Sequence, residues 1–472
     1  MNNMNTRELV LDMLLEITGK HAYSHILIRE VLDKYNYMDS RDKSFVKRLT
    51  EGTLERMLQI DFILNQFSKV PVAKMKPLIR CLLRMSVYQL LFLDNVPDSA
   101  VCNEAVKLAG KRGFRNLQGF VNGVLRNIAR QKAVLQREAA SFYPNRQKQP
   151  GEHLSVLYSM PLWIVEKWLP AYGYEVTERM LQGLMEIHAV TVRIRQEASE
   201  SERDNWLAAL QEQKVRVQIH PYLSYAFLLS DVEGIQSLPG FMEGFFMVQD
   251  VSSMLVTECA GIKAGDLILD VCAAPGGKAL HAADKLFMER DTQDRHKEAD
   301  GEQQGRILAR DLTENKIALI QNNIDRMQMP NITAQVWDAC KPDETLIGKA
   351  DVVFADVPCS GLGILGKKRD IKYNVTPESL SAVNQLQRSI LSVVQQYVKP
   401  GGILMYSTCT INQEENEQMV AWITEELPFV TESMAERLPP QLKDDEKNRG
   451  MLQLLPGIHA TDGFFLAKLR RV

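Results

Sequence analysis

The stretch from Asp266 to Leu280, DLILDVCAAPGGKAL, constrains the fold of this chain more than any other part of its sequence. The apolar run over residues 267–272 predicts a buried strand, Pro275-Gly276-Gly277 predicts a turn, and residues 278–283 predict a helix. This order suits a nucleotide-like ligand, because glycines let the backbone approach it and the first helical N–H groups face it. Such a turn is also common in ordinary loops, so this stretch alone leaves both interpretations open.

Strands and helices alternate after the glycine turn, as a doubly wound parallel sheet requires. Further strands are predicted over residues 306–311, 332–338, 351–356 and 402–408. The first three end in Asp311, Asp338 and Asp356, and Cys359 and Cys409 follow the last two. An isolated acid at a strand end is usually a helix cap. Repetition at the edge where open α/β sheets bind ligands instead predicts a functional site.

The charge of the chain is unevenly distributed. Residues 1–150 carry 24 Lys and Arg against 14 Asp and Glu, whereas the whole chain of 472 residues has a net charge of −3. A basic first domain favours a polyanionic partner, and its basic residues gather near its end. They are Lys107, Lys111, Arg112, Arg115, Arg126 and Arg130. The alternative is that these side chains form a solvated helix face.

Periodicity divides the chain into three parts: 1–145, all helical; 146–240, a linker with a small α+β module; and 241–472, the predicted α/β sheet. In the first part we expect a helix from Asp39 through about Gln66 and a fully buried helix over 79–93. Residues 143–160 are polar and proline-bearing, which predicts a linker. Residues 288–305 are highly charged, so we expect an exposed loop and assign it no chemistry.

The seven cysteines are odd in number, scattered and never in C-x-x-C spacing. This usage argues against disulfides and against a zinc site, and it favours a reducing cytosol, hence a cytoplasmic protein. No apolar run reaches the length of a membrane span, and no signal peptide is predicted. Cys81, Cys259 and Cys272 are expected to be inert buried residues. Cys359 and Cys409 lie just beyond strands, where a reactive thiolate can be exposed.

Three motifs resemble the signatures of S-adenosylmethionine-dependent RNA cytosine-5 methyltransferases. They are DVCAAPGGK at 270–278, ADVPCSG at 355–361 and STCTINQEENE at 407–417, supported by VQDVSS at 248–253 and DGFF at 462–465. Residues 4–142 resemble the NusB family of helical RNA-binding domains, which narrows the likeness to the Sun/RsmB subfamily. One departure is Arg369, where the family often has proline, so the conformation of that turn is left open.

The resemblance implies a Rossmann-like class I methyltransferase domain with a seven-stranded sheet, behind a NusB-like domain and a small α+β module. It implies S-adenosyl-L-methionine as cofactor and no metal. The cofactor-binding residues would be Cys272, Ala273, Ala274, Pro275, Gly276, Gly277 and Lys278, with Asp311 at the ribose, Asp338 by the adenine, and Asp356. The catalytic residues would be Cys409 as nucleophile, Cys359 for product release, Asp356 facing the cytosine, and Lys278.

The implied substrate is a cytosine of 16S ribosomal RNA, cytosine 967 in that family, on free RNA or an early small-subunit particle. Neither DNA nor a membrane is expected as a partner. A thiolate adding to C6 makes C5 nucleophilic enough to take a methyl group, which divides one hard step into easier ones. Two alternatives stay open: a methyltransferase for tRNA or another RNA, and a non-catalytic RNA-binding assembly factor with a vestigial cofactor site.

Overall fold

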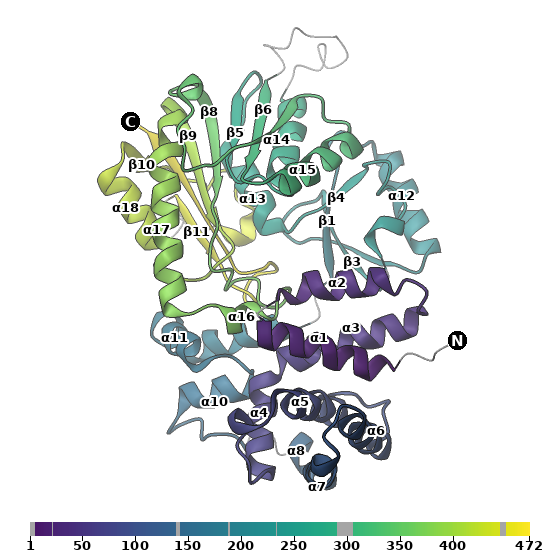
Figure 1. Ribbon diagram of the computed structural model, residues 1–472. Helices are drawn as coiled ribbons and strands as arrows, with labels where there is room; N and C mark the ends of the chain where they lie inside the picture. The colour runs from purple at the N-terminus through teal and green to yellow at the C-terminus, as the bar shows by residue number, and fades with distance from the viewer. Residues whose placement is uncertain are drawn as a thin grey trace. The chain divides into compact units, whose positions relative to one another are not determined.

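The computed structural model describes residues 5–20, 22–137, 142–186, 189–232, 234–289, 305–443 and 450–472. They form two compact units (Figure 1). The helical unit comprises Met1–Glu186 and Leu365–Val375, and the sheet unit comprises Ile187–Ile364 and Thr376–Val472. Most of the loop expected over 288–305 lies outside the described residues.

The helical unit packs its helices around α5, whose side chains are buried on nearly every side, as predicted. Its helices are α1 (Thr6–Lys20), α2 (Ser24–Lys34), α3 (Ser40–Glu55), α4 (Met57–Phe67), α5 (Pro77–Phe92), α6 (Asp98–Lys111), α7 (Gln118–Arg130), α8 (Lys132–Arg137), α10 (Pro150–Leu157), α11 (Leu162–Met185) and α16 (Ile371–Asn374). Helices α1–α8 share one apolar core, to which α1 and α3–α7 each contribute a buried stripe.

Two local predictions in this unit need correction. The single helix expected from Asp39 to about Gln66 is two helices, because Arg56 leaves helical geometry (φ −96°, ψ 10°). The break lets α3 and α4 each turn a separate apolar stripe toward α5. The expected linker contains α10, which begins at Pro150, a residue suited to a first helical turn. Leu154 of that helix is fully buried.

The segment Leu365–Val375 belongs to the helical unit although it lies between two strands of the sheet unit in sequence. Arg369 forms ion pairs with Glu51 and Glu55 of α3, each at 2.8 Å. Lys372 is buried, and its Nζ donates to the Glu55 carbonyl at 2.7 Å. Burial lowers the pKa of Lys372 to about 7. The sequence left the conformation of the turn at Arg369 open. In the structure, contacts to a helix more than 300 residues earlier hold this turn.

The sheet unit contains two separate sheets. The smaller, the antiparallel module, has the order β2-β3-β1-β4 and is covered by α12. Its elements are β1 (Val190–Ile194), α12 (Glu200–Glu212), β2 (Arg216–Ile219), β3 (Ala226–Ser230) and β4 (Phe246–Val248). These strands and α12 form the small α+β module that the sequence predicts.

The larger sheet has the order β10-β12-β9-β8-β5-β6-β7, and β11 pairs with β12 as an eighth strand. Its elements are α13 (Val251–Ala260), β5 (Leu267–Asp270), α14 (Gly277–Met288), β6 (Arg306–Asp311), α15 (Glu314–Met327), β7 (Ile332–Val336), β8 (Ala350–Asp356), α17 (Pro377–Val394), β9 (Val398–Thr408), α18 (Glu417–Glu426), β10 (Phe429–Thr431), β11 (Met451–Leu454) and β12 (Phe464–Arg471). β5–β9 are parallel, and β10–β12 pair antiparallel.

The helices cover both faces of this sheet (Figure 1). Alternate residues of each strand point to opposite faces: in β5, Ile268 packs with α13–α15, and Leu269 packs with α17 and α18. The chain goes from β5 to β6 on one side and later places β8 on the other. This reversal opens a crevice at the carboxyl end of β5, as doubly wound sheets do. The predicted fold class is confirmed.

Candidate active site

The turn after β5 carries the first part of the site. β5 ends at Asp270, and α14 begins after Gly276, whose φ of +104° is the left-handed conformation that favours glycine. The N–H of Ala274 donates to Oδ2 of Asp311 at 3.0 Å, so the acid at the end of β6 holds the turn in place. The first turn of α14 is thereby presented to the crevice, where its N–H groups attract a negatively charged group.

A cavity of about 220 Å³ lies at this edge of the sheet. Eight of the residues predicted from the sequence line it: Cys272, Ala273, Ala274, Pro275, Gly277, Lys278, Asp356 and Cys409. Its other walls come from Val248, Gln249, Asp250, Ser252, Ser253, Asp270, Ile364, Asp462 and Phe464. Residues from five separate stretches of the sequence therefore meet around one space.

Lys278 and Asp356 form the charged centre of the cavity. Nζ of Lys278 lies 2.6 Å from Oδ2 of Asp356, and the hydroxyl of Ser407 donates to Oδ1 at 2.8 Å. The same ammonium lies 5.5 Å from the ring centre of Phe464, within reach of a cation–π interaction. Asp356 is thus fixed by two donors and remains partly exposed to the cavity.

The two predicted cysteines meet at the side of this cavity. Sγ of Cys359 lies 3.1 Å from Sγ of Cys409, although 50 residues separate them in the sequence. The hydrogen bond with Cys409, together with burial, raises the pKa of the Cys359 thiol well above its usual value. Cys359 is therefore a protonated thiol beside Cys409, while Cys409 is the one that lines the cavity.

Glycines join the cysteine loops to the C-terminal loop. The N–H of Gly363 donates to the carbonyl of Cys409 at 3.0 Å, and the N–H of Gly463 donates to the carbonyl of Gly363 at 2.9 Å. A Cβ atom at Gly363 would lie 1.9 Å from the carbonyl oxygen of Gly463, so no side chain fits there. The DGFF stretch at 462–465 therefore belongs to the site through backbone contact.

A buried network, the Glu415 scaffold, supports both cysteine loops. The side chain of Glu415 accepts hydrogen bonds from Ser360 N at 2.8 Å, from Asn412 Nδ2 at 3.0 Å and from Gln387 Nε2 at 3.2 Å. The hydroxyl of Ser360 also contacts Glu415 and lies 2.8 Å from the hydroxyl of Thr410. Glu415 is fully buried and satisfied, so it orders the loops of Cys359 and Cys409 together.

Asp270 was not singled out from the sequence. It is 1% exposed, lines the cavity, and neither of its carboxyl oxygens has a hydrogen-bond partner among the described residues. Burial raises its pKa to about 7, although Lys278 nearby opposes this. An unpaired buried carboxylate facing a cavity fits a cationic group such as the ammonium of an amino acid. The sequence signal that could have identified Asp270 is its place as an acid at the last position of a strand, within the motif at 270–278.

Besides Cys359, three predicted residues lie outside the cavity lining. Asp311 is almost buried, and besides the turn it accepts from Leu312 N at 2.7 Å and Lys316 Nζ at 2.8 Å. Asp338 follows β7, where it accepts from Cys340 N at 3.0 Å. Gly276 shapes the turn without lining the space.

The predicted basic surface of the helical unit is narrower than expected. Lys107 pairs with Glu104 at 2.9 Å, and Lys111 and Arg112 pair with acids of α1. Arg126 and Arg130, in contrast, are exposed and line a groove of about 360 Å³ between α6 and α7. The cationic surface available to a polyanion is therefore centred on α7.

Membrane-spanning helices and metal clusters do not occur in the described part of the chain. None of the helices found there combines the length and the apolar character that crossing a membrane requires. In the same residues, no three His, Cys, Asp or Glu side chains are grouped to hold a metal ion.

Known proteins resemble the chain along its whole length. Three families match it: the NusB family over residues 4–130, the Methyltr_RsmF/B-like ferredoxin-like domain over 160–235, and 16S rRNA methyltransferase RsmB/F over 260–470. A Bacillus subtilis protein named probable ribosomal RNA small subunit methyltransferase B is 33% identical, covering 100% of both chains. A Synechocystis protein of the same name is 30% identical, covering 99% of this chain and 100% of its own.

Solved structures show the same fold. The crystal structure of PH0851 matches with a TM-score of 0.76 at 23% identity, over 99% of each chain. NSun6 from Pyrococcus horikoshii with SFG matches with a TM-score of 0.54 at 21% identity, over 65% of this chain and 97% of its own.

Proposed function

The chain belongs to the ribosomal RNA small subunit methyltransferase B family, and on that premise we propose that it methylates C5 of a cytosine in 16S ribosomal RNA. The observation that carries this proposal is the pair Cys359 and Cys409, 3.1 Å apart beside the Lys278–Asp356 pair. Two thiols at one cavity provide a nucleophile and a separate acid or base, which methyl transfer to C5 needs.

The proposed chemistry begins with Cys409. Its thiolate forms a bond to C6 of the cytosine, and the C5–C6 π electrons make C5 nucleophilic. Bound S-adenosylmethionine supplies the electrophilic methyl group. The C5 proton then leaves to a base, the C5–C6 double bond forms again, and the bond between C6 and Cys409 breaks. Cys359, a protonated thiol whose sulfur contacts that of Cys409, is placed to give a proton to the Cys409 sulfur as it departs.

Asp356 and Lys278 would act on the polar edge of the base. A protonated Asp356 can donate a hydrogen bond to cytosine N3 and so stabilise the adduct. Nζ of Lys278, 2.6 Å from Oδ2, holds the Asp356 carboxyl group in place at this edge of the base. Lys278 thereby counts as a catalytic residue as well as a wall of the cofactor site.

The residues at the carboxyl ends of β5–β7 fit the cofactor. We assign the backbone of Cys272–Lys278 to the methionine end, Asp311 to the ribose and Asp338 to the adenine. Asp270 supplies what the sequence assignment lacked, an unpaired carboxylate for the ammonium of the methionine group. Cys272 was predicted to be buried, but it is half-buried and lines the cavity. Desolvation still raises the pKa of its thiol, so its contribution is through backbone and shape.

For the RNA we assign residues 1–145 as the RNA-binding domain, 146–240 as linker and module, and 241–472 as the catalytic domain. The groove with Arg126 and Arg130 fits phosphates, and the names of the relatives favour RNA of the small ribosomal subunit. We keep cytosine 967 as the proposed target because the family resemblance implies it. A tRNA substrate is the second candidate. The intact set of Cys409, Cys359 and Asp356 argues against a vestigial site.

The test separates the two cysteines by mutation and a denaturing gel with RNA and S-adenosylmethionine. Cys409→Ala should give neither adduct nor product. Cys359→Ala should still attack and methylate but fail to release, so a covalent protein–RNA band should accumulate. Cys340→Ala, which changes a half-buried cysteine outside the cavity lining, should behave like the unmodified protein. A denaturant-stable band from Cys409→Ala, with none from Cys359→Ala, would reverse the assignment.

The substrate is tested separately. Bisulfite sequencing of ribosomal and transfer RNA from cells with and without the protein should show one cytosine of 16S RNA that loses protection from deamination. Loss of protection in a tRNA alone would support the second candidate.

A further inference from the structure

The antiparallel module contributes one wall of the catalytic cavity. The wall follows β4, which pairs with β1 so that Val192 faces Val248. The next residue, Gln249, donates its N–H to the carbonyl of Thr191 at 3.1 Å and is 6% exposed. Gln249 lines the cavity with Gly277 and Lys278 of the catalytic domain. The module therefore reaches the site through a side chain whose position its own strands fix.

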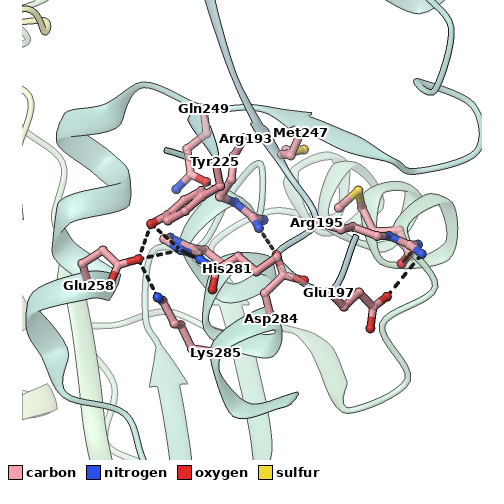
Figure 2. Close-up of polar contacts among 12 residues, drawn as sticks. Arg193, Arg195, Glu197, Tyr225, Met247, Gln249, Glu258, His281, Asp284 and Lys285 are labelled. Atoms are coloured by element: carbon pink, nitrogen blue, oxygen red, sulfur yellow. Dashed lines mark hydrogen bonds and ion pairs between the residues drawn. The ribbon is translucent and has the colours of Figure 1, made fainter. Parts of the chain in front are cut away.

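Arg193 of β1 determines how the Gln249 amide is oriented. Arg193 is fully buried, and its Nε donates to Oε1 of Gln249 at 3.0 Å. Figure 2 shows its guanidinium pointing toward Asp284 of α14, with which it forms a buried ion pair. A guanidinium has donors only, so it can bind the oxygen end of the amide but not the NH₂ end. The NH₂ group of Gln249 is thus held on the other side, 3.5 Å from the hydroxyl of Ser253.

The amide lies directly over the start of α14. A Cβ atom built on Gly277 would be 3.5 Å from Cδ of Gln249 and 3.6 Å from its Nε2. Because Gly277 is the first residue of the helix, the side-chain donor and the first N–H groups of α14 converge on one place. Donors that converge at a helix N-terminus favour a negatively charged group, such as a carboxylate.

The same face of α14 is clamped by further contacts (Figure 2). Lys285 pairs with Glu258 of α13 at 2.6 Å, and Glu258 also contacts the hydroxyl of Tyr225 from the module. Burial lowers the pKa of His281 to about 3, so this ring is neutral and lies 3.3 Å from the same hydroxyl. These contacts hold the helix against the module, which fixes the distance between Gln249 and Gly277.

We propose that Gln249 is a cofactor-binding residue whose NH₂ group donates to the carboxylate of the methionine part of S-adenosylmethionine, and that Arg193 is the positioning residue that orients it. The inference rests on the cofactor of the proposed function. It makes the antiparallel module a part of the cofactor site as well as a support for it.

The test uses a pair of ligands that differ in one group. S-adenosylmethionine and its decarboxylated form share the nucleoside, the sulfonium and the ammonium, and only the first has the carboxylate. In calorimetry on the full chain, Gln249→Met should weaken S-adenosylmethionine about tenfold or more, as the loss of a hydrogen bond to a charged group predicts. Binding of the decarboxylated ligand should be unchanged. Gln249→Glu, which still accepts from Arg193 but repels a carboxylate, should lose more.

Arg193 is tested through the ratio of the affinities for S-adenosylmethionine and its decarboxylated form. Arg193→Lys keeps a positive charge beside Asp284 but cannot hold both partners along one planar group. It should lower the preference for the carboxylate-bearing ligand, and the double variant with Gln249→Met should show no further loss in that ratio. A purely structural role would weaken both ligands equally and add to the effect at Gln249.

Three outcomes would overturn the proposal. The first is equal weakening of both ligands by Gln249→Met, and the second is unchanged binding of both. The third is a higher KM for RNA with unchanged KM for S-adenosylmethionine in a separate methylation assay, which would place Gln249 at the target nucleotide. No RNA enters the binding experiment, so its result does not depend on whether the product is 5-methylcytosine.

Discussion

Two buried carboxylates in the sheet unit differ in every contact that they make. Glu415 accepts hydrogen bonds from the side chains or backbone of three residues and supports both cysteine loops. Asp270 is equally buried, yet neither of its oxygens has a partner among the described residues. Burying an unpaired charge is costly, so a chain retains one where a ligand completes it. The comparison separates Glu415, whose hydrogen bonds are complete in the folded chain, from Asp270, whose proposed partner is a bound ligand.

The largest loss of stability and activity is expected from a substitution at Glu415. Glu415→Gln places an NH₂ group among donors from Ser360, Asn412 and Gln387, so at least one of them loses its acceptor. At about 1–3 kcal/mol for each unsatisfied buried group, we expect about 2–5 kcal/mol lower stability and loss of product. Urea unfolding and a methylation assay measure the two effects. Gln413→Ala, at an exposed neighbour, should change neither. Full activity in Glu415→Gln would show that the scaffold is dispensable.

A substitution at Asp270 should change the stability in the opposite direction and raise it. Its pKa is about 7 in the folded chain and 3.8 as a free side chain, so folding binds a proton between these pH values. Stability contributed by this group is therefore lost as the pH rises from about 4 to 7. Asp270→Asn lacks that loss and should unfold at a higher temperature at pH 8, on the order of 1–4 kcal/mol more stable, with little difference at pH 4.

The same variant should bind S-adenosylmethionine more weakly, because an amide cannot attract the ammonium as a carboxylate does. Thermal unfolding at pH 4 and 8 and calorimetry with the cofactor provide the two measurements. A variant that is less stable at pH 8, or that binds the cofactor normally, would contradict the contrast with Glu415.

Asp311 lies between the two extremes, since it holds the glycine turn and is also assigned to the ribose. Asp311→Ala should weaken binding of S-adenosylmethionine by about 1.5–3 kcal/mol, the range for hydrogen bonds to charged groups. Calorimetry measures this, with Asp325→Ala on the exposed side of α15 as the control. Unchanged affinity would remove Asp311 from the site and leave it with the structural role that its contact to Ala274 already shows.

The smallest effect is expected on the surface, where solvent satisfies every charge. Arg126→Gln with Arg130→Gln should weaken RNA binding and lower the slope of log affinity against log salt by about 0.7–0.9 for each phosphate that the variant no longer neutralises. Lys107→Gln, whose cation already pairs with Glu104, is the matched control and should leave the slope nearly unchanged. Filter binding across a salt series compares both variants with the unmodified protein. Equal slopes would assign the groove another role, such as binding a ribosomal protein.

Much of this site could be predicted from the sequence because its residues follow strands. Strand ends are visible as apolar runs that stop at a polar residue, and parallel strands bring those ends together. That logic located Asp311, Asp356 and the region of both cysteines. The sequence also predicted the central buried helix α5, because its apolar residues occur on every side.

The missed features depend on long-range packing that no local pattern records. Glu415 lies in a polar stretch typical of a solvated loop, but it is fully buried because donors from Ser360, Gln387 and Asn412 surround it. Arg193 alternates with apolar residues, as an exposed strand residue would, yet it faces Asp284 inside the protein. The break at Arg56 likewise follows from packing against α5, whereas local helix propensity favours continuity.

Because Leu365–Val375 packs as part of the helical unit, the order of synthesis on the ribosome affects how that unit assembles. The first part of this unit ends at Glu186, and its last part emerges roughly 190 residues later, about 10–40 s at ordinary rates of translation. During that time Glu51 and Glu55 lack Arg369. The nascent helical unit is therefore incomplete until the stretch just after Cys359 has been made, so translation itself sets when its assembly can finish.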